Sequence, residues 1–354
     1  MATRVPPEPS TGPAHDVPTA RLDGRALCPR AELPRAELPR APLAHHEQNN
    51  EVMAAPDRTP LDLEVRWIHG SRSRRHRTDR PLQVHALAPD TVLIRQSKDL
   101  TFEAPFILLL LGHRRALLLD SGATPGETLR ATVDALIDTW SADHGVERLE
   151  LVVAHTHGHG DHTAGDAAFA GRPRTTVVGA DVDAVRAYFG FTDWPGQVVP
   201  FDLGGRVIEL FGIPGHQRAS IAVHDPLTGL LHTGDTVYPG RIYVEDPPAL
   251  LDTLDRLVAF AQDRDVVHVL GCHVEMTRTP GRDYPLGCRY QPDEPSPFMT
   301  PEQLRRVRDA FHTVADRPGI HRFDDVVFCN GEGPRVTVPL YARAAVERVR
   351  RLVS

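Results

Sequence analysis

The sequence has little cysteine, no long hydrophobic run and no excess of positive charge, and each shortage excludes a class of protein. Four cysteines in 354 residues, with no C-x-x-C pair, are too few for a disulfide scaffold, so we interpret them as reduced thiols of a cytoplasmic protein. The longest apolar runs, 107–111 and 116–119, are too short to span a membrane, and residues 1–10 lack the apolar stretch of a secretory signal. The net charge of -7 argues against nucleic acid, which binds to basic surfaces. We therefore predict neither a membrane nor nucleic acid as a partner.

Composition divides the chain into three parts. Residues 1–60 are rich in Pro, Ala and Arg and repeat the pentapeptide Pro-Arg-Ala-Glu-Leu from Pro29 and from Pro34. Such a segment buries too little apolar surface to offset its conformational entropy, so we predict a disordered tail; alternatively, translation starts at Met53. Residues 61–80, which include a basic run at 72–80, are interpreted as a linker. A folded domain is predicted over residues 81–354.

Short strand-like runs bounded by turns begin near residue 81. Gly204-Gly205 and Asp225-Pro226 have the composition of turns between such runs. The predicted strands cover residues 83–95, 102–112, 115–120, 149–154, 197–203, 206–212, 221–224, 230–233 and 266–270.

Helices are predicted between these strands. One should begin at Thr124, where Glu127 completes a capping box. A second should begin at Asp246, just before Pro247, and a third at Thr300, with Gln303 in the reciprocal capping position. Strands that alternate with helices indicate an α/β fold.

The most informative segment runs from His155 to His162 and reads His-Thr-His-Gly-His-Gly-Asp-His. It directly follows the apolar run 151–154, so it should occupy the loop that leaves a buried strand. His157 and His159 stand two residues apart, and an extended segment points both imidazoles to one side. Asp161 and His162 follow on the turn into the next helix and can reach a second position nearby. A bound metal would neutralise and orient such a concentration of ligand-type residues.

Three further ligand-type residues, His216, Asp235 and His273, each follow a strand-like run directly. Glycine precedes two of them, at Gly215 and Gly234, and would let the backbone turn tightly. We expect these side chains to converge with the histidine-rich loop.

The H-x-H-x-D-H pattern at 157–162, followed in order by these three residues, resembles the metallo-β-lactamase superfamily, in its glyoxalase II or lactonase-like branch. The resemblance covers residues 81–275 and includes Asp120, which matches an early Asp-x-Gly element. It implies an αββα sandwich, two mixed β-sheets with helices outside, for a catalytic domain at 81–354.

The same resemblance implies a two-metal site with two Zn²⁺, although iron or manganese also accept these ligands. His157, His159 and His216 would form the first metal position. Asp161, His162 and His273 would form the second, with Asp235 bridging the two. A metal-bridging hydroxide would then be the nucleophile, and Asp161 would orient it. Tyr238 matches a tyrosine that hydrogen-bonds substrate in lactonase-type relatives.

The leading functional hypothesis is hydrolysis of an ester, thioester or lactone of a small molecule, which would be the partner. Two β-lactamase types are disfavoured, because one has cysteine in place of Asp235 and the other lacks this carboxylate. The nuclease branch carries a large domain inserted between the metal-binding aspartate and the final histidine. Only the 37 residues 236–272 separate Asp235 from His273, which is too few for that domain, so this branch is excluded. The alternatives are a sulfur dioxygenase-type oxidoreductase of the same fold with one iron, and a metal-binding protein without catalysis.

Three neighbouring features have less certain roles in the sequence. His155 is expected to pack or to make a supporting hydrogen bond, and Cys272 to be a small core residue. The Gly- and Pro-containing segment 275–297 is predicted to be a loop that walls the substrate pocket; a plain surface connection is the alternative.

Overall fold

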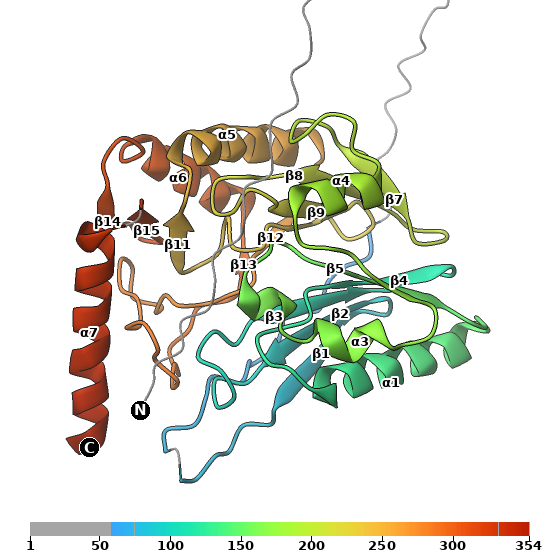
Figure 1. The fold of residues 1–354 in the computed structure, drawn as a ribbon, viewed down its shortest axis with the longest axis horizontal. Coiled ribbons are helices and arrows are strands. Elements are labelled where there is room, and N and C mark those ends of the chain that lie inside the picture. The colour runs from blue at the N-terminus through green and yellow to red at the C-terminus, as the bar shows by residue number, and fades with distance from the viewer. Residues whose placement is uncertain (1–57, 74, 332, 354) are drawn as a thin grey trace, which may run out of the picture. The chain divides into compact units, whose positions relative to one another are not determined.

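The computed structural model describes residues 58–73, 75–331 and 333–353 (Figure 1). The predicted disordered tail lies almost wholly outside the described residues, as does Cys28. Residues 61–67 pack against the domain: Trp67 is buried, and its ring lies 5.0 Å from that of Phe106 in an edge-on arrangement. In the described ranges, no helix is both long and apolar enough to cross a membrane.

The first sheet has six strands in sequence order. The strands are β1 (Leu82–Ala88), β2 (Thr91–Gln96), β3 (Phe106–Leu110), β4 (Arg115–Leu119), β5 (Glu150–Ala154) and β6 (Thr175–Val177). β1 to β4 pair antiparallel, whereas β4, β5 and β6 pair parallel, so the sheet is mixed. The prediction of one strand over 83–95 was wrong: the chain turns at Pro89 and Asp90 and forms β1 and β2. Proline fixes φ and has no amide donor, which favours a turn at this point.

The second sheet also has six strands. Their spatial order is β13 (Phe298–Met299), β12 (His268–Leu270), β10 (Leu230–His232), β9 (Ile221–Asp225), β8 (Val207–Gly212) and β7 (Val199–Asp202). Only β10 and β12 pair parallel within it. A three-stranded sheet that the sequence did not predict stands beside it, with β11 (Arg241–Val244), β15 (Val327–Asn330) and β14 (Gly319–Arg322) in that order.

Seven helices are found in the described part of the chain. They are α1 (Glu127–His144), α2 (Gly160–Thr163), α3 (Asp166–Ala170), α4 (Val182–Phe189), α5 (Pro247–Asp263), α6 (Pro301–His312) and α7 (Pro334–Val353). The predicted starts of α5 and α6 are confirmed: Asp246 caps α5 by accepting from the amide of Ala249, and Thr300 forms the capping box with Gln303.

The predicted start of α1 was wrong by two residues. Its N-cap is Gly126, without a side-chain cap. The hydroxyl of Thr124 accepts a hydrogen bond from Nε2 of Gln96 instead, at 3.0 Å. A tertiary contact has therefore replaced the local capping interaction.

Three hydrophobic clusters define the layers, and they confirm the αββα sandwich. The central cluster lies between the sheets and joins residues such as Leu108 and Leu117 of the first sheet to Leu210 and Val223 of the second. A second cluster packs α1 against the outer face of the first sheet, and a third packs α5 and α6 against the outer face of the second. Figure 1 shows these helices on opposite sides of the two sheets.

The strand directions gather several loops at one place. β8, β10 and β12 run in the same direction, so their carboxyl ends lie at the same edge of the second sheet. β4 and β5 are parallel neighbours in the first sheet. The loops that leave these strands carry the ligand-type residues singled out in the sequence.

Candidate metal centre

The first three histidines meet in a tight triangle. Nε2 of His157 lies 2.9 Å from Nδ1 of His159, and Nε2 of His216 lies 3.2 and 3.1 Å from these two atoms. A tetrahedral zinc ion with Zn–N bonds of about 2.0–2.1 Å holds its ligand atoms roughly 3.3 Å apart. The triangle therefore has close to the dimensions of one face of a metal's ligand shell.

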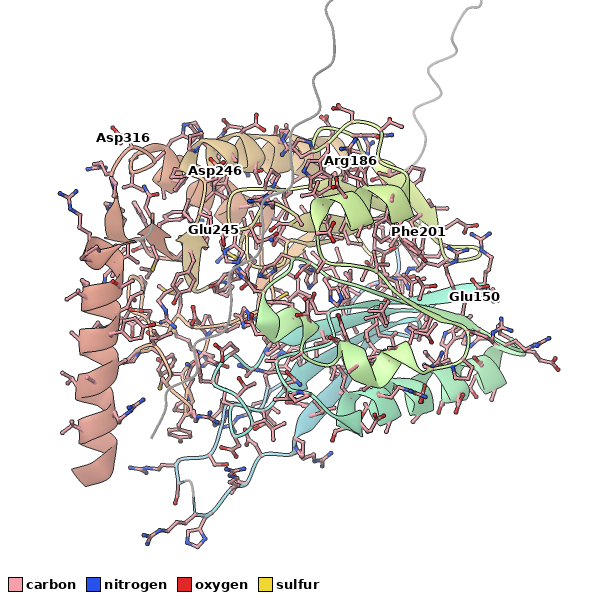
Figure 2. The ribbon with its side chains drawn as sticks, in the orientation of Figure 1. Glu150, Arg186, Phe201, Glu245, Asp246 and Asp316 are labelled. Atoms are coloured by element: carbon pink, nitrogen blue, oxygen red, sulfur yellow. The ribbon has the colours of Figure 1, made fainter. Side chains whose placement is uncertain are left out.

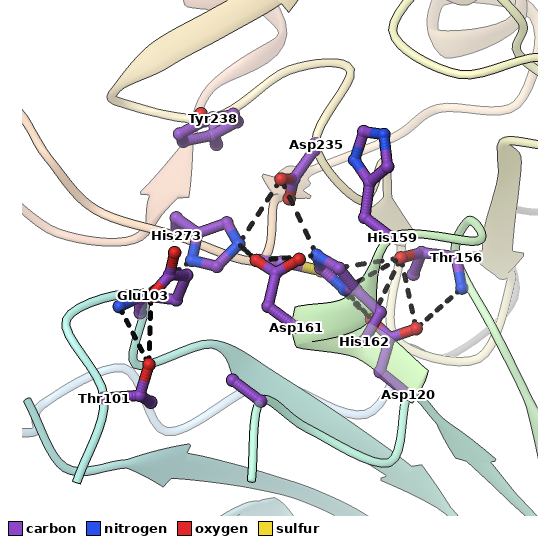
Figure 3. Close-up of polar contacts among 12 residues, drawn as sticks. Thr101, Glu103, Asp120, Thr156, His159, Asp161, His162, Asp235, Tyr238 and His273 are labelled. Atoms are coloured by element: carbon purple, nitrogen blue, oxygen red, sulfur yellow. Dashed lines mark hydrogen bonds and ion pairs between the residues drawn. The ribbon is translucent and has the colours of Figure 1, made fainter. Parts of the chain in front are cut away.

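The second group lies next to the first and consists of four residues. Oδ2 of Asp161 lies 3.4 Å from Nε2 of His162 and 3.4 Å from Nε2 of His273. Oδ2 of Asp235 lies 3.6 and 3.3 Å from the same two nitrogens, as the dashed lines in Figure 3 show. The donor atoms of this group all lie close enough together to hold one ion.

Asp235 stands between the two groups. Its Oδ2 is 3.9 Å from Nε2 of His216 in the first group and 3.3 Å from Nε2 of His273 in the second. A carboxylate in this position can reach both metal positions, as a bridging ligand must.

Buried polar atoms without partners test whether a metal fits. Oδ1 of Asp235, Nε2 of His162 and Nε2 of His273 are buried and have no hydrogen-bond partner in the described structure. Leaving such atoms unsatisfied is unfavourable, and coordination to a cation would satisfy them. The seven residues therefore fit a metal centre of imidazole and carboxylate ligands.

The ring nitrogens that point away from the centre are held by hydrogen bonds. Nδ1 of His216 contacts the carbonyl of Tyr243 at 2.7 Å, and Nδ1 of His273 contacts the carbonyl of Glu103 at 2.9 Å. Nε2 of His159 lies 3.2 Å from Oε1 of Glu245. Such contacts fix the tautomer and the orientation of ligand histidines.

Asp120 holds the histidine-rich loop in place through hydrogen bonds. Its Oδ1 accepts the amide of Thr156 at 2.7 Å, and its Oδ2 lies 2.8 Å from Nδ1 of His162. The Thr156 hydroxyl contacts the same carboxylate and lies 3.2 Å from Nδ1 of His157. Asp120 thus links the turn after β4 to both groups of ligands.

The electrostatics differ between the two groups. Burial, followed by the charge of His162, lowers the pKa of His157 well below its ordinary value, and burial likewise lowers the pKa of His216. These imidazoles are neutral at pH 7 and have lone pairs to donate. Burial alone would lower the pKa of His273, but the nearby negative charges of Asp235 and Asp161 raise it to about 10. A divalent cation in the second group would displace such a proton, so its binding is coupled to proton release.

Glycine is required where two of the ligand loops turn. Gly215 has φ of 136°, and a Cβ there would lie 2.5 Å from Cα of Leu250 in α5. Gly234 has φ of 53°, and its Cβ would lie 2.8 Å from Cβ of Thr156. Larger residues would push His216 and Asp235 out of position.

Three other residues singled out in the sequence lie at or beside the centre. The ring of Tyr238 is 5.7 Å from that of His273, but its hydroxyl donates to the carbonyl of Arg241. His155 is buried, with Nε2 3.2 Å from Oδ2 of Asp166. Cys272 is fully buried, and its thiol donates to Oδ2 of Asp120 at 3.3 Å.

A cavity of about 670 Å³ opens over the candidate ligands. Segment 275–297 contributes Glu275 and Leu286 to its lining, whereas α7 contributes four residues: Val336, Thr337, Leu340 and Tyr341. Sequence reasoning missed α7 and the carboxylates of Glu103 and Glu245. Pro334 followed by Val336 and Leu340 was an available signal for α7.

Comparison with known proteins agrees with this geometry. Residues 100–273 match the family model of the metallo-beta-lactamase superfamily. Hydroxyacylglutathione hydrolase of Synechococcus sp. (strain JA-3-3Ab) is 32% identical over 139 residues, which cover 35% of this chain and 52% of that protein. The hydrolase of the same name from Gloeothece citriformis (strain PCC 7424) is 36% identical over 126 residues, or 31% and 46% of the two chains. The chain thus spans about half the length of these curated relatives.

Solved structures with a similar fold are more distant. A metallo-beta-lactamase from Pontibacter korlensis has a TM-score of 0.44 and 16% identity, covering 65% of this chain and 99% of its own. A metallo-beta-lactamase from Erythrobacter litoralis has a TM-score of 0.44 and 16% identity, covering 67% and 99%.

The αββα sandwich, the clustered ligand-type residues and the family match together place residues 100–273 in the metallo-β-lactamase superfamily. Within that superfamily, the chain is similar to proteins named hydroxyacylglutathione hydrolase over about a third of its own length.

Proposed function

We propose that this protein is a metal-dependent hydrolase that cleaves an ester, thioester or lactone bond of a small molecule. The observation that carries the proposal is the convergence of seven imidazole and carboxylate side chains, five of which line a cavity. Membership of the superfamily supports the same reaction class, as do relatives named hydroxyacylglutathione hydrolase.

The donor set suggests two zinc ions, one in each group. Bound ions of this kind would supply a nucleophile from water at neutral pH and polarise the oxygen of the scissile bond. The protein's own contribution is to hold and orient. In the proposed reaction, Asp161 would accept a hydrogen bond from the attacking water and so direct it.

Two predictions from the sequence, about the location of the protein and about its partner, remain part of the proposal. We retain a cytoplasmic location, based on the cysteine content, and a small molecule as the partner. The size of the cavity suits such a ligand, since small-molecule sites have volumes of roughly 300–1,000 Å³.

Substitution of the carboxylate between the two groups tests the proposal. Asp235→Ala should lower kcat/KM on a cleavable thioester or lactone by at least about a thousandfold, because both ions lose a shared ligand. The measurement combines steady-state kinetics with metal content per chain, and the metal content should fall below two ions.

Asp252→Ala is the matched control, because Asp252 is an exposed aspartate on α5. Its metal content and activity should equal those of the unaltered protein. An Asp235→Ala protein with full activity would contradict the proposal. One iron per chain with oxygen uptake on a persulfide would also contradict it.

A further inference from the structure

The lining of the cavity over the candidate metal ligands contains two chemically different sets of residues. His159, Asp161 and His273 belong to the polar set. The apolar set includes Val336 and Leu340 of α7, which are both buried. A substrate whose reactive bond lies at the ligands must therefore extend towards an apolar surface.

Other apolar side chains continue this surface. Phe102 comes from the loop before β3, Val244 from the end of β11, and Leu286 from segment 275–297. These elements are far apart in sequence, so the apolar wall is a property of the folded domain.

The charged groups of the cavity are all acidic once the ligands are set aside. Glu103, Glu245 and Glu275 line it, and no lysine or arginine does so among the residues that the structure describes. Glu275 is already paired: it accepts the amide of Arg241 at 2.8 Å and also contacts its guanidinium. Arg241 is buried and also bonds Asp283 at 3.1 Å, so it is not available to a ligand.

Glu103 and Glu245 have only neutral or weakly basic partners. Glu103 accepts the hydroxyl of Thr101 at 2.9 Å, and the two are drawn side by side in Figure 3. Glu245, labelled in Figure 2 where β11 leads into α5, lies 3.2 Å from Nε2 of His159. Neither carboxylate forms a salt bridge to lysine or arginine within the described ranges.

From this distribution we infer that the substrate is an uncharged ester or thioester whose apolar chain lies against α7, and that glutathione thioesters are rejected. The inference rests on the proposed hydrolase function. A glutathione thioester carries two carboxylates and one ammonium group. Its carboxylates would be desolvated beside Glu103, Glu245 or an apolar wall without a cationic partner, which is unfavourable. An aliphatic chain gains from leaving water at the same surface.

A matched pair of substrates tests the inference on the metal-loaded protein. Hexanoyl thioesters of N-acetylcysteamine, which is neutral, and of glutathione share the acyl group and the scissile bond. The neutral thioester should have at least about tenfold higher kcat/KM, because the site leaves the glutathione carboxylates unpaired. Lengthening the acyl chain of the neutral series from acetyl to butanoyl should raise kcat/KM by roughly threefold for each methylene.

A positive charge introduced on α7 tests whether the part of the cavity lining formed by this helix causes the difference between the two thioesters. Thr337 is exposed and lines the cavity, so Thr337→Arg should supply a cationic partner and narrow the difference between the two thioesters by several-fold. Val338→Arg is the matched control: Val338 is 62% exposed and does not line the cavity. In the Val338→Arg control, the ratio of kcat/KM for the neutral thioester to kcat/KM for the glutathione thioester should stay unchanged.

Calorimetric titration with non-hydrolysable thioethers separates this inference from the hydrolase proposal. The hexyl thioether of N-acetylcysteamine should bind more tightly than S-hexylglutathione, whether or not any thioester is cleaved. Absence of all cleavage with this binding order would reject the hydrolase function and retain the apolar, uncharged ligand. Equal or tighter binding of S-hexylglutathione, or preferred cleavage of its thioester, would overturn the inference.

Discussion

The candidate ligands are positioned by residues that do not themselves line the cavity, and Asp120 is the clearest example. It is fully buried after β4 and bonds both the Thr156 amide and Nδ1 of His162. Burial raises the pKa of Asp120, but the charge and hydrogen bond of His162 outweigh it and hold the pKa below its ordinary value. A carboxylate in this place increases the basicity of the imidazole it supports.

Asp120→Asn should therefore weaken metal binding at the second group by about ten- to a hundredfold, with little change in the fold. Competition with a chelator of known affinity measures the change. Asp138→Asn, at an exposed position on α1, provides the control and should leave the affinity unaltered. Equal affinities for the two variants would mean that Asp120 has no role in the metal site.

Substitution of Tyr238 can distinguish a structural role of this residue from a contact with substrate. Because its hydroxyl donates to the carbonyl of Arg241, Tyr238→Phe should leave that buried carbonyl short of a donor. We expect a loss of about 1 kcal/mol in the free energy of unfolding, and less than about threefold change in kcat/KM. Chemical denaturation and kinetics on the same preparation measure both. A loss of kcat/KM above about tenfold with unchanged stability would instead favour the substrate contact predicted from the sequence.

The candidate metal ligands could be predicted from the sequence only where their spacing along the chain, or their position after a strand, determines where the side chains lie. His157 and His159 are two apart after a buried strand, and His216, Asp235 and His273 follow strands whose ends meet. The two acidic groups at the cavity were not readable in this way. Glu103 lies in an irregular loop and Glu245 at a strand end without a repeated pattern, so only the tertiary fold brings them to the cavity.

Among the elements, the cavity wall depends on a buried ionic cluster that joins α7 to the domain. Asp283, in segment 275–297, lies within salt-bridge distance of Arg241 in β11, Arg322 in β14 and Arg343 in α7. Its side chain is 1% exposed. The cluster therefore fixes both the helix and the segment that line the cavity.

Acid should loosen this cluster. Burial alone would raise the pKa of Asp283, but the hydrogen bond from Arg343 and the charges of Arg241 and Arg343 lower it below its ordinary value. A lowered pKa in the folded state means that the stabilisation is complete above about pH 4 and is lost as the pH falls through the folded-state value. Asp283→Asn should thus destabilise the protein by about 3 kcal/mol at pH 7 and by less at pH 3, below the ordinary pKa of an aspartate.

Urea denaturation at pH 7 and at pH 3 measures the two differences. The control is Asp255→Asn, which removes a half-exposed partner of Arg308 and His312 on the outer helices. Pairs at such exposure contribute about 1 kcal/mol or less. A destabilisation by Asp283→Asn that is the same at both pH values would rule out the ionic origin.

Local signals predicted some elements and failed for others, for physical reasons. The caps at Asp246 and Thr300 formed as expected, because within the described ranges no tertiary hydrogen bond competes for those side chains. Thr124 was taken up by Gln96, which moved the start of α1. α7 contains Pro339, a residue that usually ends a helix, and it is nevertheless helical while Val336 and Leu340 pack against Cys329. Packing of that kind is invisible in a local pattern.

For the domain as a whole, the candidate metal centre draws its residues from both sheets, which also meet through apolar contacts and through polar contacts of Arg206 with Asp90 and Thr91. His157, His159 and His162 belong to the loop and helix that follow β5 of the first sheet, whereas His216, Asp235 and His273 follow strands of the second. Ions held by residues of both sets can bind only when the two sheets are packed in their native relative positions. Metal binding should therefore be coupled to global stability and not merely to local order.

Removal of metal should lower the thermal midpoint substantially. Each ion present at a hundredfold excess over its Kd adds about 2.7 kcal/mol. At about 2 °C per kcal/mol for a domain of this size, one ion should raise Tm by roughly 5 °C and two by roughly 10 °C. Calorimetry on chelator-treated protein, before and after titration with zinc, measures the increments. His273→Ala should keep the increment of the first group and lose that of the second, since only the second group contains His273. A single step that is identical in both proteins would show that the two groups do not bind separate ions.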